Sequence, residues 1–496
     1  MAVPKVMGTE IEYGITVVND RDFDPISSCV LLVNAYREDS PEKILWDYDQ
    51  ENPLADARGF QVEGERYTPN QQENIARNKT LANGARYYVD HAHPEYSCPE
   101  VTNARDLVAF EKAGERIVEI SRREANAMLP AGAKLLLYKN NSDRKGNSYG
   151  CHENYLMDRR TSFKQIVEHM MPFFVTRQIY CGSGKVGSEN RADPCDYQLS
   201  QRADFFETEV ALDTMVKRPI INTRDEPHAD REKYRRLHVI VGDSNMSEFT
   251  IYLRNGVTAI VLAMIEDGAI TRSLSLRDPV RAIKEVSHDP SLRAELALEG
   301  GGRWTAIQIQ KEFHAMALRW AARPDAEISD VDRDVIERWG EVLEALERDP
   351  MELARHIDWI IKKQMIESFM ERKGLDWDSP QVQMLDLQYH DLRPDKGLYY
   401  LLERQGKVER IVEDSEISRA IHRPPEDTRA YFRGECLRRY GSEVFGVNWD
   451  SISFGIGDDP IKRVLMAEPL KGSRAHVEGL LDASPTASEL VENLRA

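Results

Sequence analysis

Two glutamates near the amino terminus, Glu10 and Glu12, have a spacing that suits metal chemistry. They lie in residues 5–18, where apolar residues alternate with small or acidic ones, and this pattern predicts a strand. Residues two apart on a strand share a face, so both carboxylates would point to one side. Such carboxylates repel each other unless a cation lies between them, and a hard divalent ion is the natural partner. From spacing alone, the solvated polar face of an exposed strand is an equally good explanation.

A second strand-like segment, residues 86–100, repeats the pattern with different side chains. Arg86, Tyr88 and Asp90 would share one face and would offer a cation, a phenol and a carboxylate. The two segments together predict a polar sheet face that could bind metal ions and an anionic ligand.

The residues after Asp90 allow a competing metal. His91, His93 and Glu95 could form a zinc site, since two histidines and a carboxylate suit catalytic zinc. We favour magnesium for two reasons: Pro94 is expected to interrupt the strand, and the nearby amino-terminal glutamates are hard oxygen donors.

Two histidines, His152 and His238, lie in further strand candidates. A lone strand histidine is more often a satisfied core or surface residue than a ligand. Added to the carboxylate strands, however, these two strands could place five or six ligands on one sheet face. That number would suit two or more magnesium ions holding a polyphosphate.

Arg202 and Arg224 could bind carboxylate or phosphate oxygens, because the guanidinium group presents a rigid fork of donors. Each lies beside acidic residues, so ordinary surface ion pairing is the simpler explanation. Two glycine-rich segments are excluded as nucleotide motifs: residues 181–189 lack the Walker A spacing, and residues 454–459 lack the third glycine of a dinucleotide fingerprint.

Composition narrows the class of protein. The 496 residues are 41% hydrophobic and 30% charged, which is typical of a globular protein, and the net charge of −18 argues against general nucleic-acid binding. We expect no secretory signal and no membrane span, hence a cytoplasmic location. The six scattered cysteines are expected to be free thiols.

The order of elements predicts an α+β fold, with antiparallel strands mainly from the first half and helices mainly from the second. We expect a core-facing helix over 104–128 and helices over 257–372. Two hairpins are expected, pairing 134–140 with 152–158 and 235–243 with 247–254.

Two segments stand apart from this pattern. Residues 37–84 are polar and carry scattered Pro, Asn and Gly, which predicts a mobile insertion loop between two strands. A Pro pair near residue 424 predicts a boundary between a catalytic domain, 1–424, and a small C-terminal domain, 425–496.

Taken together, the motifs resemble the family of enzymes that act on Pup, the prokaryotic ubiquitin-like protein. The resemblance runs in order through MGTEIEYG, NGARYYVDHAHPEYSCPE, GNSYGCHENYL, SQRADFFE, NTRDEPHAD and LHVIVGDSNMSE, and it reaches WDSISFGIGDDP near the C-terminus. That family has a ligase branch and a deamidase branch. The opening GTEIEYG, the sequence DHAHPE and the long insertion at 37–84 all resemble the deamidase branch.

The resemblance implies a glutamine-synthetase-like large domain, with a curved antiparallel sheet and a small C-terminal domain. It also implies site residues. Glu10, Tyr88 and Glu95 match magnesium positions, and Glu12, His152 and His238 resemble ligands of the remaining ions. Arg86 and Trp449 match nucleotide-contact positions. Arg202 and Arg224 match positions near the phosphate and the substrate carboxylate. Asp90 matches the catalytic aspartate. Cys98 replaces a small or hydroxyl residue expected beside the nucleotide and receives no role.

The implied activity is hydrolysis of the C-terminal glutamine amide of Pup and of the Pup–lysine isopeptide bond. Both reactions break an amide at the same γ-carbonyl, so one site could perform both. The implied cofactors are ATP, or ADP plus phosphate, and Mg²⁺, and the implied partners are Pup and pupylated proteins of the proteasome pathway. A monomer is expected. The alternatives are a Pup ligase, a small-molecule glutamate ligase, and a noncatalytic Pup-binding adaptor.

Overall fold

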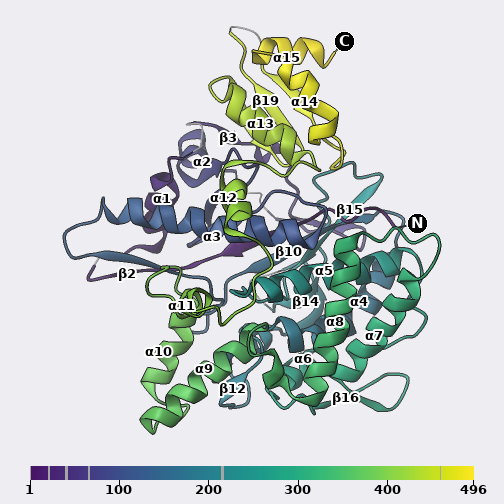
Figure 1. Cartoon of the computed structure of the whole chain (residues 1–496). Helices are drawn as coiled ribbons and strands as arrows, with labels where there is room; N and C mark the ends of the chain where they lie inside the picture. The colour runs from purple at the N-terminus through teal and green to yellow at the C-terminus, as the bar shows by residue number, and fades with distance from the viewer. Residues whose placement is uncertain are drawn as a thin grey trace.

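A six-stranded antiparallel sheet organises the large part of the computed structural model (Figure 1). The structure describes residues 2–20, 23–38, 43–64, 68–213, 217–457 and 460–495. The strand order is β15-β10-β1-β8-β7-β6. The bounds are β15 Tyr234–Val239, β10 Cys151–Asp158, β1 Met7–Glu12, β8 His93–Ser97, β7 Arg86–Asp90 and β6 Asn78–Thr80.

The predicted alternation in the first strand is confirmed. In β1, Met7, Thr9 and Ile11 are buried on one face, whereas Glu10 and Glu12 are half-buried on the other. The strand period of two therefore separates an apolar side, which packs on helices, from a polar side, which faces a cavity.

Helices cover the apolar side of the sheet and confirm the α+β fold. α3 packs on α5, and α5 in turn contacts α4 and α8. The helices of the large part are α1 Pro25–Ala35, α2 Gln71–Arg77, α3 Ala104–Asn126, α4 Phe163–Cys181, α5 Glu248–Glu266, α6 Pro279–Ser287, α7 Ala306–Ala321, α8 Asp330–Arg348, α9 Asp358–Lys373, α10 Pro380–Tyr389, α11 Leu398–Arg404 and α12 Asp414–His422. The short strands are β2 Gly14–Val18, β3 Leu45–Trp46, β4 Ala55–Asp56, β5 Phe60–Gln61, β9 Lys134–Tyr138, β11 Lys185–Val186, β12 Tyr197–Gln198, β13 Thr208–Ala211, β14 Pro219–Asn222, β16 Glu295–Ala297 and β17 Arg303–Thr305.

Both predicted hairpins are wrong. β9 pairs with β2, while β10 pairs with β1 and β15, because apolar alternation marks a strand without choosing its partner. Residues 248–254 begin α5, and the Ser247 hydroxyl caps it by accepting from Thr250 N at 3.2 Å. A short apolar run does not separate a strand from a buried helix.

By length and composition α5 could cross a bilayer, but its apolar window is wholly buried inside the protein. It is the central core helix of the large part.

The chain turns earlier than expected in segment 86–100. The reversal occurs at His91, whose φ is 49°, and Pro94 lies within β8 opposite Val89. Pro94 lies before the residues of β8 that pair with β1, since that pairing covers Glu95 to Ser97. This hairpin brings Glu95 directly opposite Tyr88.

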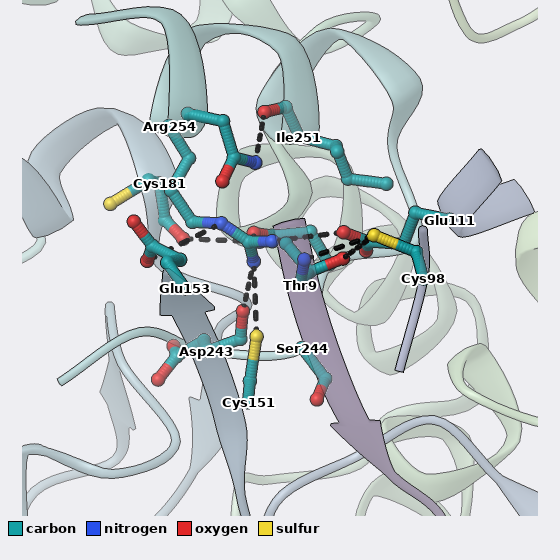
Figure 2. Close-up of polar contacts among 12 residues, drawn as sticks. Thr9, Cys98, Glu111, Cys151, Glu153, Cys181, Asp243, Ser244, Ile251 and Arg254 are labelled. Carbon is teal, nitrogen blue, oxygen red and sulfur yellow. Dashed lines mark hydrogen bonds and ion pairs between the residues drawn. The ribbon is translucent and has the colours of Figure 1, made fainter. Parts of the chain in front are cut away.

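A buried ionic network anchors the apolar face of β1 and β10 (Figure 2). Arg254 of α5 is fully buried and donates to Cys151 Sγ at 3.4 Å and to Glu111 Oε2 at 3.1 Å. Its Nε lies 3.6 Å from Glu153 Oε1. Buried charges are costly unless they are paired, so these contacts restrict where β10 can lie relative to α3 and α5.

The C-terminal residues form a second, smaller apolar core around Leu437, Val447, Ile452 and Leu490. Its elements are α13 Ala430–Tyr440, β18 Val444–Asn448, β19 Ser451–Phe454, β20 Lys462–Leu465, α14 Arg474–Asp482 and α15 Ala487–Asn493. The boundary at residue 425 stays a prediction.

Segment 37–84 is more structured than expected. It contains α2 and the short strands β3 to β6, and β3 pairs in parallel with β18 of the C-terminal sheet. The segment therefore connects the two parts of the chain. Its mobility stays a prediction, and residues 39–42 and 65–67 lie outside the described residues.

Candidate active site

One large cavity, of about 1330 Å³, lies over the polar face of the central sheet. The structure brings all of the predicted site residues to its wall: Glu10, Glu12, Arg86, Tyr88, Asp90, Glu95, His152, Arg202, Arg224, His238 and Trp449. They come from β1, β7, β8, β10, β15 and from loops far apart in the sequence.

Three carboxylates form the first potential metal centre. Glu12, Asp90 and Glu95 each offer an oxygen, and these oxygens all lie within 4.8 Å of one another. Strand register explains why these carboxylates lie close together, since Glu95 lies opposite both Glu12 and Tyr88. Burial and the charges of neighbouring carboxylates raise the pKa of Glu95 well above its ordinary value. A divalent cation would relieve this repulsion, so the donor set fits Mg²⁺.

Glu10, His152 and His238 form the second potential centre, again with ligand atoms within 4.8 Å of one another. His152 Nδ1 lies 3.2 Å from Glu10 Oε2. Although burial alone would raise the pKa of Glu10, the hydrogen bond to His152 and the nearby positive groups hold it well below its ordinary value. Burial lowers the pKa of His238 well below its ordinary value, which favours the neutral ring that metals bind.

The alternative zinc triad does not assemble. Among the described residues, neither His91 nor His93 belongs to a group that could hold a metal. His91 Nδ1 instead lies 2.9 Å from Asp90 Oδ2, and the His93 ring stacks on Tyr149 at 4.4 Å.

Asp90 lies at the end of β7, where the strand turns. Burial opposes its ionisation, but the hydrogen bond from His91 and the nearby positive charge lower the pKa of Asp90 below its ordinary value. The same hydrogen bond and the Asp90 charge raise the pKa of His91 to about 9. Asp90 is therefore an ionised carboxylate at neutral pH, as a nucleophile or a general base must be.

Arg86, Tyr88 and Trp449 line another part of the cavity, and the buried Trp46 ring contacts Arg86 and Trp449. The Arg86 guanidinium lies 4.0 Å from the Trp46 ring centroid and 3.8 Å from that of Tyr88. The Trp46 and Trp449 rings meet edge to face at 5.3 Å. Flat rings beside a fixed cation suit a nucleotide base and its phosphates.

The two predicted anion-binding arginines differ in their surroundings. Arg202 is almost fully buried and donates to Ser148 Oγ at 3.2 Å and to Gly242 O at 3.1 Å. Arg224 is half-buried, and its backbone forms an isolated bridge with Asp56 of the 37–84 segment. Both reach the cavity wall.

Sequence reasoning missed two polar neighbours of the second centre, Arg236 and Asn154. Arg236 Nη1 lies 3.7 Å from Glu10 Oε1, and Asn154 Nδ2 donates to the same oxygen at 3.0 Å. Each lies two residues from a predicted histidine on the same strand, Arg236 from His238 and Asn154 from His152. The two-residue periodicity could therefore have found both.

Comparison with known proteins decides the family, because residues 5–453 match the family described as Pup-ligase protein. The chain belongs to the Pup-ligase protein family. A depupylase of Acidothermus cellulolyticus is 51% identical over 501 residues, which cover 99% of each chain. A Pup deamidase/depupylase of Mycolicibacterium smegmatis is 48% identical over 499 residues, again 99% of each chain.

Solved structures of the Pup-ligase protein family share the α+β fold. The ligase PafA in complex with Pup has a TM-score of 0.81 and 34% identity, covering 97% of this chain and 92% of that one. PafA in complex with ADP has a TM-score of 0.75 and 36% identity, covering 86% of this chain and 96% of that one.

Proposed function

We propose that this protein is a Pup deamidase and depupylase. It hydrolyses the side-chain amide of a C-terminal glutamine on Pup and the isopeptide bond between Pup and a lysine. The observation that carries the proposal is the meeting of ionised Asp90 with Glu12 and Glu95 in one large cavity. The curated relatives named depupylase or Pup deamidase/depupylase are 46–51% identical, against 34–36% for the solved ligases, which favours hydrolysis over ligation.

Magnesium and ATP, or ADP plus phosphate, are the proposed cofactors. Glu10, Glu12, Tyr88, Glu95, His152 and His238 would hold the metal ions, and Arg86, Arg224 and Trp449 would contact the nucleotide. When bound, metal and nucleotide would supply positive charge and fixed oxygen atoms beside the reacting amide. Because amide hydrolysis is already downhill, the nucleotide would be a lasting cofactor. Consumption of one ATP per amide cleaved would contradict this role.

Asp90 performs the chemical step in this proposal. One carboxylate oxygen attacks the γ-carbonyl carbon, the carbon–nitrogen bond breaks, and the nitrogen takes up a proton and leaves as ammonia or as the lysine amine. Water then hydrolyses the resulting anhydride, which restores Asp90 and releases Pup ending in glutamate. In the alternative, Asp90 removes a proton from water, and that water attacks the carbonyl.

An oxygen-18 experiment separates these two routes. Under single-turnover conditions in labelled water, label enters the Asp90 carboxylate only by the anhydride route, when water attacks the Asp90 carbonyl. Label in Asp90 would therefore exclude the general-base route, whereas label only in Pup is expected from that route and from an anhydride that water attacks at the Pup carbonyl.

The activity itself is tested by incubating the full chain with Pup ending in glutamine, ATP and Mg²⁺. Mass analysis should show conversion of the amide to the acid, and Asp90→Asn should reduce the rate by about 10³-fold or more. Formation of a Pup–protein conjugate from Pup ending in glutamate, with stoichiometric ADP release, would instead support the ligase alternative.

Recognition of Pup is proposed to use the basic wall of the cavity. Arg202, Arg218, Arg144 and Lys145 line this wall and would attract an acidic, mostly disordered partner that folds on binding. Arg144→Ala should weaken Pup binding more at low salt than at high salt. If Arg144→Ala bound Pup with unchanged affinity at every salt concentration, the proposed role of the basic wall in Pup binding would be contradicted.

A further inference from the structure

Asn154 links the three strands that build the second potential metal centre. It lies on β10, opposite His238 of β15 and opposite Gly8 of β1. Its Oδ1 is 2.6 Å from Arg236 Nη1 and 2.9 Å from His238 Nδ1, and its Nδ2 is 3.0 Å from Glu10 Oε1. One amide therefore contacts two of the three potential ligands, Glu10 and His238.

The orientation of this amide follows from its neighbours. An arginine can only donate hydrogen bonds, and an ionised carboxylate can only accept them. The Asn154 oxygen must therefore face Arg236, and its NH₂ group must face Glu10. Rotating the amide by half a turn would place two donors against each other at 2.6 Å and two acceptors at 3.0 Å.

The fixed amide then determines the tautomer of His238. An amide oxygen 2.9 Å from His238 Nδ1 requires a proton on that nitrogen, because two lone pairs at this distance repel. The competing contact, from Arg236 Nη1 to His238 Nδ1, is longer at 3.3 Å, and the same Nη1 already donates to Asn154. With the proton on Nδ1, the lone pair of neutral His238 is on Nε2.

We propose that Asn154 is a positioning residue, which holds His238 in the Nδ1–H tautomer and orients Glu10 so that both can bind one divalent ion. This inference rests on the metal dependence in the proposed function. Partners behind a ligand commonly change metal affinity by about 10–100-fold. Asn154 would act through its hydrogen bonds to His238 and Glu10 and not as a ligand.

The test uses Mn²⁺ as a spectroscopic probe with the full-length protein. Electron paramagnetic resonance titration gives the Mn²⁺ affinity, and pulsed measurements detect ¹⁴N coupling from coordinated histidine. Asn154→Leu removes both the acceptor and the donor, so we expect affinity to fall about 10–100-fold and histidine coupling to weaken. Asn154→Asp keeps an acceptor for His238, so histidine coupling should persist. His238→Ala shows which part of the ¹⁴N coupling comes from His238, so that the loss in Asn154→Leu can be assigned to this ring.

Asn126→Leu is the matched control. Asn126 is also half-buried and makes three hydrogen bonds, with Arg122 O and with Leu135 N and O, but it lies on α3 and does not line the cavity. It should lower thermal stability without changing Mn²⁺ affinity or histidine coupling.

Two results would overturn the inference. One is wild-type affinity and undiminished histidine coupling in Asn154→Leu. The other is the absence of histidine coupling in the unmodified protein, which would mean that this cluster does not bind the ion. The Pup amide assay is independent of both, so a failed positioning role and a failed deamidase function can be told apart.

Discussion

Glu95 lies directly opposite Glu12 in the pairing of β8 with β1, so two carboxylates from neighbouring strands point into one cavity. Like charges opposite each other destabilise a sheet unless something compensates them. Electrostatic repulsion between the Glu12 and Glu95 carboxylates therefore destabilises this part of the sheet, and a bound cation would remove it.

Glu95→Gln should have opposite effects with and without metal. Burial and the neighbouring carboxylates raise the pKa of Glu95, and in EDTA the neutral amide removes both the cost of burying a charge and the repulsion, so Tm should rise by about 1–3 °C. With Mg²⁺ the unmodified protein should gain more stability, because the Glu95 carboxylate binds a divalent cation more strongly than the neutral amide of the variant does. Differential scanning fluorimetry measures both conditions, and the exposed Glu337→Gln on α8 is the control. The same Tm difference in EDTA and in Mg²⁺ would argue against a metal at Glu95.

Gly150→Ala should disturb the histidine centre without replacing any of the proposed ligands. A Cβ at Gly150 would lie 2.5 Å from His152 Nε2, so the ring must shift. We expect Mn²⁺ affinity to fall about 10-fold, within the range for a displaced ligand. Gly300→Ala is the matched change, because a Cβ at Gly300 meets nothing within 4 Å. Equal Mn²⁺ binding by both variants would show that His152 is not a ligand.

Glu100→Gln should destabilise the junction between the large part and α13. Glu100 pairs with Arg433 and, at 2.9 Å, with Arg429. Loss of this partner leaves buried guanidinium groups unpaired and should cost about 3–5 kcal/mol in the free energy of unfolding at pH 7, measured by chemical denaturation. The exposed pair of Glu426 with Arg474 gives a control, since Glu426→Gln should cost less than about 1 kcal/mol.

The destabilisation in Glu100→Gln should also depend on pH. Burial opposes ionisation, but the two arginines lower the pKa of Glu100 to about 2. A lowered pKa in the folded state gives stability that is complete above the ordinary value of 4.5 and is lost as pH falls toward 2. The variant should therefore differ from the unmodified protein more at pH 7 than at pH 3.5. A constant difference would exclude this linkage.

Trp449→Ala should weaken nucleotide binding if the aromatic part of the cavity holds the base. Loss of an aromatic ring that contacts the base should raise the Kd for ATP about 10-fold, measured by isothermal titration calorimetry with Mg²⁺. Trp304 also lies against an arginine, Arg272 at 4.3 Å, but it does not line the cavity. Trp304→Ala should leave the Kd unchanged, and an equal loss in both variants would point to general destabilisation.

The sequence by itself determined which side chains share a face. Glu10 with Glu12, and Arg86 with Tyr88 and Asp90, line the same cavity as predicted, because alternation along a strand is a local property of the backbone. The motifs in order also indicated the family, which the match over residues 5–453 confirms.

Only the tertiary structure decided which strands lie next to each other. The pairing of β9 with β2, the helix that begins at Glu248 and the contacts of Asn154 with His238 and Glu10 depend on packing between distant segments. Strand partners are selected by burial of a whole face against helices such as α3 and α5, and no local pattern encodes that choice.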